Sequence, residues 1–511
     1  MKKTEQISTS NTERTDRDKQ WRVDLRARMT PKQRTAIPRV KMPELDPHYR
    51  ITTHLEVNEG LSLEQAVLEA TRCLDCPDPG CIKGCPVHND IPGFIKNIER
   101  REYPEAIKVL NRTTVLPAVC GRVCPQENQC EASCIYNKMG KEPIAIGNLE
   151  RFAADFEREI TGYVPIEKRT ACEDSIEEPK RPFYPIKVAV IGSGPSGLSF
   201  AGDMRMRGYG VTVFEALSQY GGVLKYGIPE FCLPNSIVDH EISKLKKMGV
   251  EFRKDVYVGK TYTYSELFEM GFKGIYVATG AGKPRFMGIP GENLPGVMTA
   301  NEYLIRLNCL GPSIFGANGV ALDGKRVAVI GGGNTAIDAV RYAIRQGADR
   351  AMIVYRRGME EMPARQEEIR HAVEEGVEFI TLTNPVEYLA NERGYLRAMR
   401  VQKMELGEPD ESGRRSPRPI AGAIEEMEVD LVVESVGYMP NPPVLSEDIA
   451  MNRKGEIVVD ETSMKSSASA IYAGGDIVRG PATVIVAMGD GRRAAASMAA
   501  VFEKAMEDIR L

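Results

Sequence analysis

The chain has 511 residues, more than a single hydrophobic core ordinarily supports, so the sequence predicts two to four domains. Hydrophobic residues make up 42% and charged residues 27%, and 67 basic against 71 acidic residues leave a net charge of -4. This balance excludes the strongly basic surface that binds nucleic acid or anionic lipid. We find no apolar run long enough for a membrane span and no signal peptide, so we expect a cytoplasmic protein with reduced cysteines.

Residues 1–50 are polar and contain several prolines and the single tryptophan, Trp21. We expect this arm to be irregular or to lie against another surface of the protein. The stretch "LSLEQAVLEATRC" predicts a helix with Ser62 and Gln65 as a capping box and Cys73 at its end. "IPGFIKNIERREYPEAIKVL" and "IGNLERFAADF" also have helical periodicity, so residues 51–170 should form a small helical domain.

Eight of the 11 cysteines lie in two runs inside this helical domain. Their spacings are Cys73-x2-Cys76-x4-Cys81-x3-Cys85 and Cys120-x3-Cys124-x5-Cys130-x3-Cys134. Thiolates are the preferred ligands of iron in cubane clusters, and short intervals let one loop supply several corners. Pro86 and Pro125 each follow a cysteine, as in ferredoxins whose last cysteine reaches a neighbouring cluster. The pattern predicts two [4Fe-4S] clusters.

Zinc is the alternative metal for these cysteines. Zinc sites usually combine two CxxC knuckles separated by a longer gap, and the x4, x3 and x5 intervals fit that arrangement less well. Spacing alone would also assign the whole run from Cys120 to Cys134 to one metal site.

After a charged linker, "IKVAVIGSGPSGLSFAGDM" predicts a strand, a glycine-rich turn and a helix. The turn has the spacing Gly192-x-Gly194-x-x-Gly197, which suits close approach of the backbone to a pyrophosphate at the helix amino terminus. The next strand, "VTVFE", ends in Glu215, twenty-three residues after Gly192, where an acid can hold ribose hydroxyls. The pattern predicts an adenine dinucleotide site; a turn that binds no phosphate is the alternative.

A second fingerprint lies in "KRVAVIGGGNTAIDAV", with Gly331-x-Gly333-x-x-Ala336. The strand that follows, "AMIVYRR", ends in Arg356 and Arg357 rather than in an acid. Guanidinium groups bind phosphate by charge and paired donors, so this site should prefer NADP over NAD unless the two arginines are merely solvated.

The two dinucleotide sites together favour FAD at the first and NADPH at the second. The strands "GIYVATGAG" and "DLVVESVGYMPN" end in glycine, as where a chain passes between two nucleotide domains, and Asp476 follows a later strand. Hydride transfer between these cofactors needs no protein nucleophile, so we assign no catalytic residue. The five histidines form no metal-ligand cluster in the sequence.

From about Pro43 to the carboxyl end, the chain resembles the small (beta) subunit of NADPH-dependent glutamate synthase. It also resembles a close relative, the large subunit of the electron-bifurcating NADH-dependent ferredoxin:NADP oxidoreductase. The resemblance rests on both cysteine runs and on "PAVCGRVCPQENQCE", "GGVLKYGIP", "GGGNTAIDA", "VYRR" and "EMPAR", which occur in the family's order. It implies an α/β fold in which two Rossmann-like domains of the glutathione-reductase type follow the helical iron–sulfur domain. The FAD-binding domain is expected to be discontinuous, at residues 185–280 and 441–511, around an NADPH-binding domain at residues 281–440.

The resemblance also implies the ligands of each cofactor, including an oxygen ligand, Glu150, and a spare thiol, Cys120. One cluster would be held by Cys73, Cys76, Cys81 and Cys134, and the other by Cys85, Cys124, Cys130 and Glu150. The expected FAD positions are Gly192, Gly194, Gly197, Glu215, Gly222 and Asp476. The expected NADPH positions are Gly331, Gly333, Asn334, Thr335, Arg356 and Arg357.

By the same resemblance, electrons pass from NADPH to FAD and then singly through the clusters to a partner. In glutamate synthase the partner is a large subunit with amidotransferase and FMN domains, which makes L-glutamate from glutamine and 2-oxoglutarate. The enzymatic alternative is the bifurcating transhydrogenase, whose partner is a small FAD/[2Fe-2S] subunit. A cluster-bearing scaffold without turnover is the non-enzymatic alternative. A disulfide reductase is disfavoured, because no CxxC follows Cys76.

Overall fold

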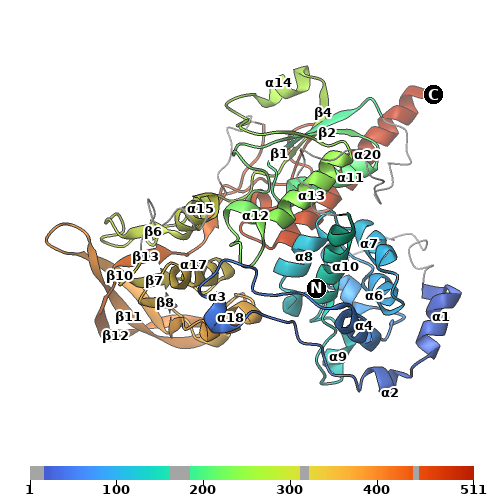
Figure 1. The fold of residues 1–511 in the computed structure, drawn as a ribbon. Coiled ribbons are helices and arrows are strands. Elements are labelled where there is room, and N and C mark those ends of the chain that lie inside the picture. Colours follow the sequence, from blue (N-terminus) through green and yellow to red (C-terminus); the bar gives the residue numbers. More distant parts are fainter. Residues whose placement is uncertain (1–16, 162–183, 311–321, 441–447, 511) are drawn as a thin grey trace. The chain divides into compact units, whose positions relative to one another are not determined.

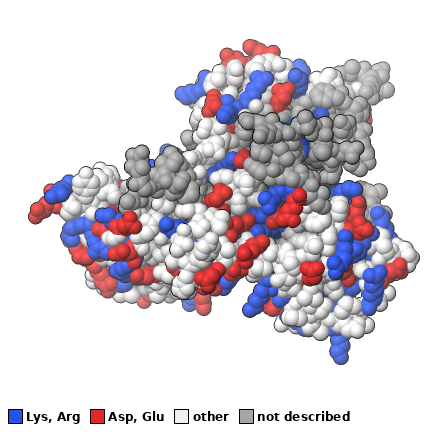
Figure 2. Space-filling model, viewed as in Figure 1, with Lys and Arg blue, Asp and Glu red and all other residues white. Residues whose placement is uncertain are grey.

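The computed structural model describes residues 17–161, 184–310, 322–440 and 448–510, which fall into two compact units (Figure 1). The first unit comprises Met1–Pro43 and Glu59–Asp174, and the second comprises Glu44–Asn58 and Ser175–Leu511. Among the described residues, no helix has both the length and the apolar character that crossing a membrane requires. Basic and acidic side chains are mixed over the visible face in Figure 2, as the small net charge leads one to expect.

The first unit is helical in its described part. Its helices are α1 (Gln20–Ala27), α2 (Pro31–Arg34), α4 (Leu63–Arg72), α5 (Gly80–Lys83), α6 (Ile91–Glu99), α7 (Tyr103–Asn111), α8 (Pro117–Val123), η2 (Gln126–Asn128), α9 (Ile135–Lys138) and α10 (Ile146–Thr161). The predicted capping box is confirmed, since Ser62 accepts from the backbone N–H of Gln65 and the Gln65 side chain accepts from that of Ser62. Cys73 is the carboxyl-terminal cap of α4, as expected.

The second unit contains two five-stranded parallel sheets. The first has the order β15-β4-β1-β2-β3, and its strands are β1 (Lys187–Ile191), β2 (Gly210–Phe214), β3 (Glu251–Arg253), β4 (Phe272–Val277) and β15 (Ile471–Ala473). The second has the order β6-β13-β7-β8-β9, and its strands are β6 (Val297–Thr299), β7 (Arg326–Ile330), β8 (Arg350–Val354), β9 (Glu378–Ile380) and β13 (Leu431–Glu434).

In both sheets, the side on which successive strands are added changes at the strand that precedes a glycine-rich turn. From β1 the chain adds β2 and β3 on one side and then β4 on the other, and β7 stands in the same relation to β8, β9 and β13. In open parallel sheets, ligands bind outside the carboxyl ends of the strands at such a switch point. The fold therefore places each fingerprint where a dinucleotide is bound.

The remaining elements of this unit cover or connect the sheets. A three-stranded antiparallel sheet is formed by β10 (Thr383–Ala390), β11 (Leu396–Pro409) and β12 (Arg415–Glu428), and β5 (Lys283–Pro284) pairs with β14 (Tyr438–Met439). The helices are α3 (Pro47–Arg50), α11 (Pro195–Met206), α12 (Val223–Tyr226), α13 (Asn235–Lys247), α14 (Tyr264–Glu269), α15 (Ala300–Leu310), α17 (Asn334–Arg345), η5 (Met359–Glu361), α18 (Gln366–Glu374), α19 (Asp476–Arg479) and α20 (Val484–Arg510).

Residues 44–58, which we call the strap, belong to the second unit although residues of the first unit flank them in sequence. The backbone N–H of Val57 donates to the carbonyl oxygen of Phe231 at 3.0 Å, and Val57 is buried in the same core cluster as α17. The buried guanidinium of Arg50 lies 2.8 Å from a carboxylate oxygen of Glu374 and 2.9 Å from one of Glu375. Apolar packing and ion pairs thus fix the strap to the second unit.

Candidate functional site

Four cysteines that are distant in sequence line one cavity of the first unit: Cys73, Cys76, Cys81 and Cys134. The rest of the wall is largely apolar, with isoleucines from α6, α9 and the segment before α10. All four are free thiols. Burial raises the pKa of Cys73 to about 11 and raises that of Cys81, which also lies beside the other three sulfurs. Thiolates gathered in an apolar pocket need a metal to compensate their charge, so these residues fit the corners of an iron–sulfur cluster.

A second group forms where the end of α8 meets the first turns of α10. Cys124 forms a hydrogen bond with Cys120, and its pKa is raised by that bond, by burial and by the neighbouring charge of Glu150. Cys85 and Cys130 each have Glu150 among their charged neighbours, and burial is the main cause of their raised pKa values. The four candidate ligands of the second cluster are therefore neighbours in this unit, and the carboxylate of Glu150 is largely buried. Cys120 is a fourth thiol beside them.

Asn89 contacts this second group. Its side-chain amide donates to Glu150 Oε1 at 3.5 Å, and its backbone N–H is hydrogen-bonded to Cys85. Its own amide oxygen accepts a short hydrogen bond from Thr113. No sequence signal pointed to Asn89, because its contacts join residues that lie far apart in the chain.

The three glycines of the first fingerprint have three different structural roles. A Cβ on Gly192, whose φ is 103°, would lie 2.4 Å from the carbonyl oxygen of Ala278, so the turn needs glycine. A Cβ on Gly197 would lie 2.1 Å from the carbonyl oxygen of Gly192, because α11 packs closely against the turn. A Cβ on Gly194 would meet no atom within 4 Å, so that glycine leaves open space beside the helix amino terminus. Such space is where a pyrophosphate is bound.

The other residues expected at FAD lie around this turn. Glu215, at the end of β2, accepts hydrogen bonds from the backbone and hydroxyl of Ser193 and is largely buried. A Cβ on Gly222 would lie 3.1 Å from the Cα of Gly194. Asp476 is the first residue of α19, and burial raises its pKa to about 6. The cradle and the acid at the end of β2 fit a dinucleotide with free ribose hydroxyls.

The second fingerprint repeats the pattern. Gly331 has a φ of 140°, and its Cβ would lie 2.4 Å from the carbonyl oxygen of Ser435, whereas Gly333 again faces open space. Asn334 Oδ1 accepts from the backbone N–H of Arg365 at 2.8 Å, and Thr335 is hydrogen-bonded to Tyr438. These residues begin α17, and the open space at Gly333 lies at the amino terminus of this helix.

The two arginines after β8 differ in their surroundings. Arg357 is 6% exposed, and it donates to the carbonyl oxygen of Arg415 at 2.9 Å and to Asp410 at 2.5 Å. Arg356 is exposed and has no side-chain hydrogen bond or ion pair among the described residues. The guanidinium of Arg356 is therefore the one available to a phosphate.

Two acidic groups near the second sheet were not expected from the sequence. Glu434, the last residue of β13, is 3% exposed and accepts from the hydroxyl of Tyr388 at 2.8 Å. Burial raises its pKa to about 8, and a hydrogen bond with Glu292 adds to the shift. Asp338, in α17, lies 3.6 Å from the sulfur of Cys232, and burial raises its pKa to about 8.

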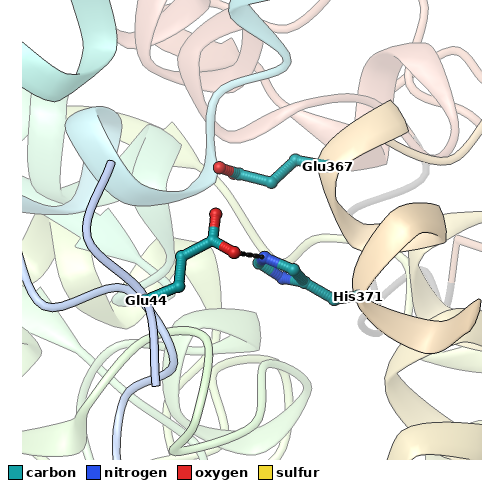
Figure 3. A group of neighbouring side chains, drawn as sticks. All are labelled: Glu44, Glu367 and His371. Atoms are coloured by element: carbon teal, nitrogen blue, oxygen red, sulfur yellow. Dashed lines mark ion pairs between the residues drawn. The ribbon is translucent and has the colours of Figure 1, made fainter. Parts of the chain in front are cut away.

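A histidine and two carboxylates meet where the strap lies against α18 (Figure 3). Glu44 Oε2 lies 3.2 Å from Nε2 of His371, and Glu367 is the third member. Arg370 donates to both oxygens of Glu44, at 2.5 and 3.0 Å, and Arg365 lies 3.0 Å from Glu367. The arginines already neutralise these carboxylates, so the group is an ion-pair network rather than a cation site.

Two dinucleotide-binding sheets in one unit and groups of buried thiols in the other define a pyridine-nucleotide oxidoreductase that handles single electrons through metal clusters. Comparison with known proteins agrees with this class. Residues 50–161 match the family model of dihydropyrimidine dehydrogenase domain II, 4Fe-4S cluster, and residues 186–491 match that of pyridine nucleotide-disulphide oxidoreductases.

The chain is 36% identical to the glutamate synthase [NADPH] small chain of Halomonas elongata, over 88% of this chain and 94% of that one. It is 34% identical to the Escherichia coli small chain, over 90% and 96% of the two chains. It is also 38% identical to the NADP(+)-dependent formate dehydrogenase subunit beta of Moorella thermoacetica, over 82% of this chain and 59% of that subunit. The chain belongs to the glutamate synthase [NADPH] small-chain family, and it is an oxidoreductase with a 4Fe-4S domain and FAD- and NADPH-binding domains.

Among solved structures, Mycobacterium tuberculosis FprA in complex with NADPH aligns with a TM-score of 0.56 at 22% identity. The alignment covers 64% of this chain and 86% of FprA. This likeness shows the fold of the nucleotide-binding half.

Proposed function

We propose that this chain is the NADPH-oxidising small subunit of a glutamate synthase. Its partner is a large subunit with amidotransferase and FMN domains, which makes L-glutamate from glutamine and 2-oxoglutarate. The observation that carries the proposal is the near end-to-end likeness to glutamate synthase small chains together with the grouping of all eight expected cluster ligands.

When bound, FAD accepts a hydride from NADPH and the clusters carry electrons one at a time. The protein supplies binding and orientation. Gly333 and the amino terminus of α17 receive the pyrophosphate of NADPH, and Arg356 pairs with its 2′-phosphate. At the other sheet, Gly194 admits the pyrophosphate of FAD and Glu215 accepts from its ribose hydroxyls.

The proposed division of the chain follows from these roles. Residues 51–170 form the iron–sulfur domain after a polar arm of residues 1–50, except that residues 51–58 belong to the strap and pack with the second unit. Residues 185–280 and 441–511 bind FAD, and residues 281–440 bind NADPH.

The assignment of Glu150 as a ligand is tested by iron analysis of anaerobically purified variants. Glu150→Ala should lose about half of the iron, because one of two cubanes loses a corner. Cys120→Ala and Glu159→Ala, which removes an exposed carboxylate from the same helix, should keep all of it. Full iron content in Glu150→Ala with loss in Cys120→Ala would make Cys120 the fourth ligand instead.

The partner is tested by mass spectrometry of the native complex, purified without oxygen. A large chain with amidotransferase and FMN domains is the expected companion. Recovery of a small flavoprotein with a [2Fe-2S] cluster would instead favour the second candidate, a subunit of an electron-bifurcating ferredoxin:NADP transhydrogenase. The partner must be identified directly because one relative of this chain is named as a subunit of a different enzyme, an NADP(+)-dependent formate dehydrogenase.

A further inference from the structure

The amino-terminal arm contacts the loop between the first two cysteines of the first unit. Arg22, in α1, donates to both carboxylate oxygens of Asp75, at 2.9 and 2.6 Å. Arg26, one turn further along α1, donates to the same carboxylate at 2.6 Å. The guanidinium of Arg17 donates to the backbone carbonyl oxygen of Asp75 at 3.1 and 3.2 Å. Three arginines of the arm therefore converge on one residue between Cys73 and Cys76.

Asp75 has an unusual backbone conformation that these contacts stabilise. Its φ is 53°, in the left-handed region that disfavours residues other than glycine, asparagine and aspartate. Its side chain is 0% exposed, so its ion pairs are shielded from water. Aspartate tolerates this region better than most residues, and the shielded ion pairs hold Asp75 in it.

The left-handed conformation directs the backbone N–H of Asp75 to the sulfur of Cys73, at 3.5 Å. A hydrogen bond to a cluster sulfur and a nearby positive charge both favour the more negative, reduced form of an iron–sulfur cluster. Two guanidinium groups against one carboxylate leave a net positive charge beside this loop. Lys96, which is fully buried and donates to the carbonyl oxygen of Cys73 at 2.5 Å, shares the carboxylate of Glu99 with Arg34 and is a further cation close to Cys73.

Simple anchoring is the competing explanation, since buried ion pairs also fix segments to a surface. Arg34 provides such an anchor elsewhere in the arm, where it pairs with Glu99 and donates to the carbonyl oxygen of Thr71. The contacts of Arg22 and Arg26 differ because they end on the residue whose N–H reaches a candidate ligand.

We propose that α1 is a tuning element for the first iron–sulfur cluster. Through Arg22 and Arg26 it fixes Asp75, keeps that residue's N–H on the Cys73 sulfur, and raises the reduction potential of the cluster. Arg22, Arg26 and Asp75 are positioning residues. The inference rests on the proposed assignment of Cys73, Cys76, Cys81 and Cys134 to one cluster.

The test is a redox titration of the anaerobically purified full chain, followed by electron paramagnetic resonance, with iron content measured in parallel. Arg22→Leu should shift the midpoint of one cluster to a more negative potential and leave the other midpoint and the iron content unchanged. Arg22→Lys keeps the charge but not the paired donors, so its midpoint potential should lie between those of Arg22→Leu and the wild type. Arg28→Leu removes the same charge from an exposed position just after α1 and should change neither midpoint.

Unchanged midpoints in a folded, fully loaded Arg22→Leu protein would overturn the proposal and leave α1 as an anchor. If Arg22→Leu does not fold, Arg26→Leu gives the same test with milder disruption, because that side chain is 21% exposed. Cys76→Ala tests the ligand assignment separately from the role of α1. It should abolish one cluster signal; if both signals and all of the iron remain, the ligand assignment is wrong whatever Arg22 does.

Discussion

At the scale of single residues, the two arginines after β8 show how identical side chains acquire different tasks. Arg357 is buried and joins the end of β8 to the start of β12, through Arg415, and to Asp410. Arg356 is exposed and unpaired among the described residues, so it has donors to offer a ligand. The sequence indicated a phosphate-binding pair, and the structure makes Arg356 the stronger candidate.

Replacing Arg356 by serine is expected to raise KM for NADPH by about ten- to a hundredfold, because the site loses one charge-assisted hydrogen-bonding group. KM for NADH should change little, because NADH carries no 2′-phosphate. Arg350→Ser removes the same charge from the opposite end of β8 and should leave both values near those of the wild type. Steady-state dye reduction with each nucleotide gives the values, and equal effects on NADPH and NADH would contradict the role of Arg356.

The buried carboxyl of Glu434 makes stability depend on pH in a defined direction. Burial raises its pKa from about 4.5 to about 8, so the folded state retains a proton that the unfolded chain releases. The free energy of unfolding therefore falls as pH rises from about 4.5 to about 8. Glu434→Gln should match the wild type near pH 5 and exceed its stability by about 1–3 kcal/mol near pH 9. Denaturant unfolding at both pH values measures this, and a difference that does not vary with pH would refute it.

At the scale of elements, each fingerprint combines a strand, a turn and a helix in which one glycine serves the ligand and the others serve the fold. Gly194 faces open space, whereas Gly197 lies against the carbonyl oxygen of Gly192. The same motif therefore contains a binding position and a packing position.

Alanine at these two glycines should separate binding from folding. Gly194→Ala is expected to weaken FAD retention while the apoprotein keeps the wild-type Tm. Gly197→Ala forces a methyl group into the contact between turn and helix and should also cost about 1–3 kcal/mol of stability. Thermal melts of apoprotein and flavin content after gel filtration distinguish the two. Equal Tm losses would show that Gly194 is a packing position as well.

Glu44 joins the strap to α18 through its ion pairs with Arg370 and His371. Burial and these contacts shift the pKa of Glu44 in opposite directions. Burial alone would raise it, but hydrogen bonds from His371 and Arg370 prevail and lower it to about 2. Glu44→Gln should therefore cost about 1–2 kcal/mol at pH 7, allowing for solvent screening. This cost should be present above pH 4.5 and vanish as pH falls toward 2. Glu411→Gln, at an exposed carboxylate of the same unit, is the control for the unfolding curves, and should show no such loss.

The sequence predicted those elements that have a recognisable local motif, such as a capping box or an apolar run before a glycine-rich turn. The helix before Cys73 has a capping box, and β1 and β7 are apolar runs that end in glycine turns, so all three were found. The antiparallel sheet of β10 to β12 was missed, because β12 is exposed along most of its length and lacks the alternation of a half-buried strand. The strap was missed because Arg50 finds its partners at Glu374 and Glu375, more than 300 residues away.

Taken as a whole, the chain consists of one helical unit with two groups of buried cysteines and a second unit with two dinucleotide-binding folds. The family relationship identified from the motifs is confirmed by the small-chain relatives. These relatives are named small chains, which implies that they have a larger partner subunit. The chemistry assigned to this chain is therefore the NADPH half-reaction, which needs no partner to be observed.

The most direct test is anaerobic stopped-flow mixing of the purified chain with NADPH or NADH, with the visible flavin band followed in time. We expect NADPH to bleach the flavin rapidly, NADH to act much more slowly, and Arg356→Ser to bring the two rates together. A flavin that NADPH leaves oxidised, or that both nucleotides reduce equally well in the wild-type protein, would contradict the assignment of this chain as the NADPH-oxidising subunit.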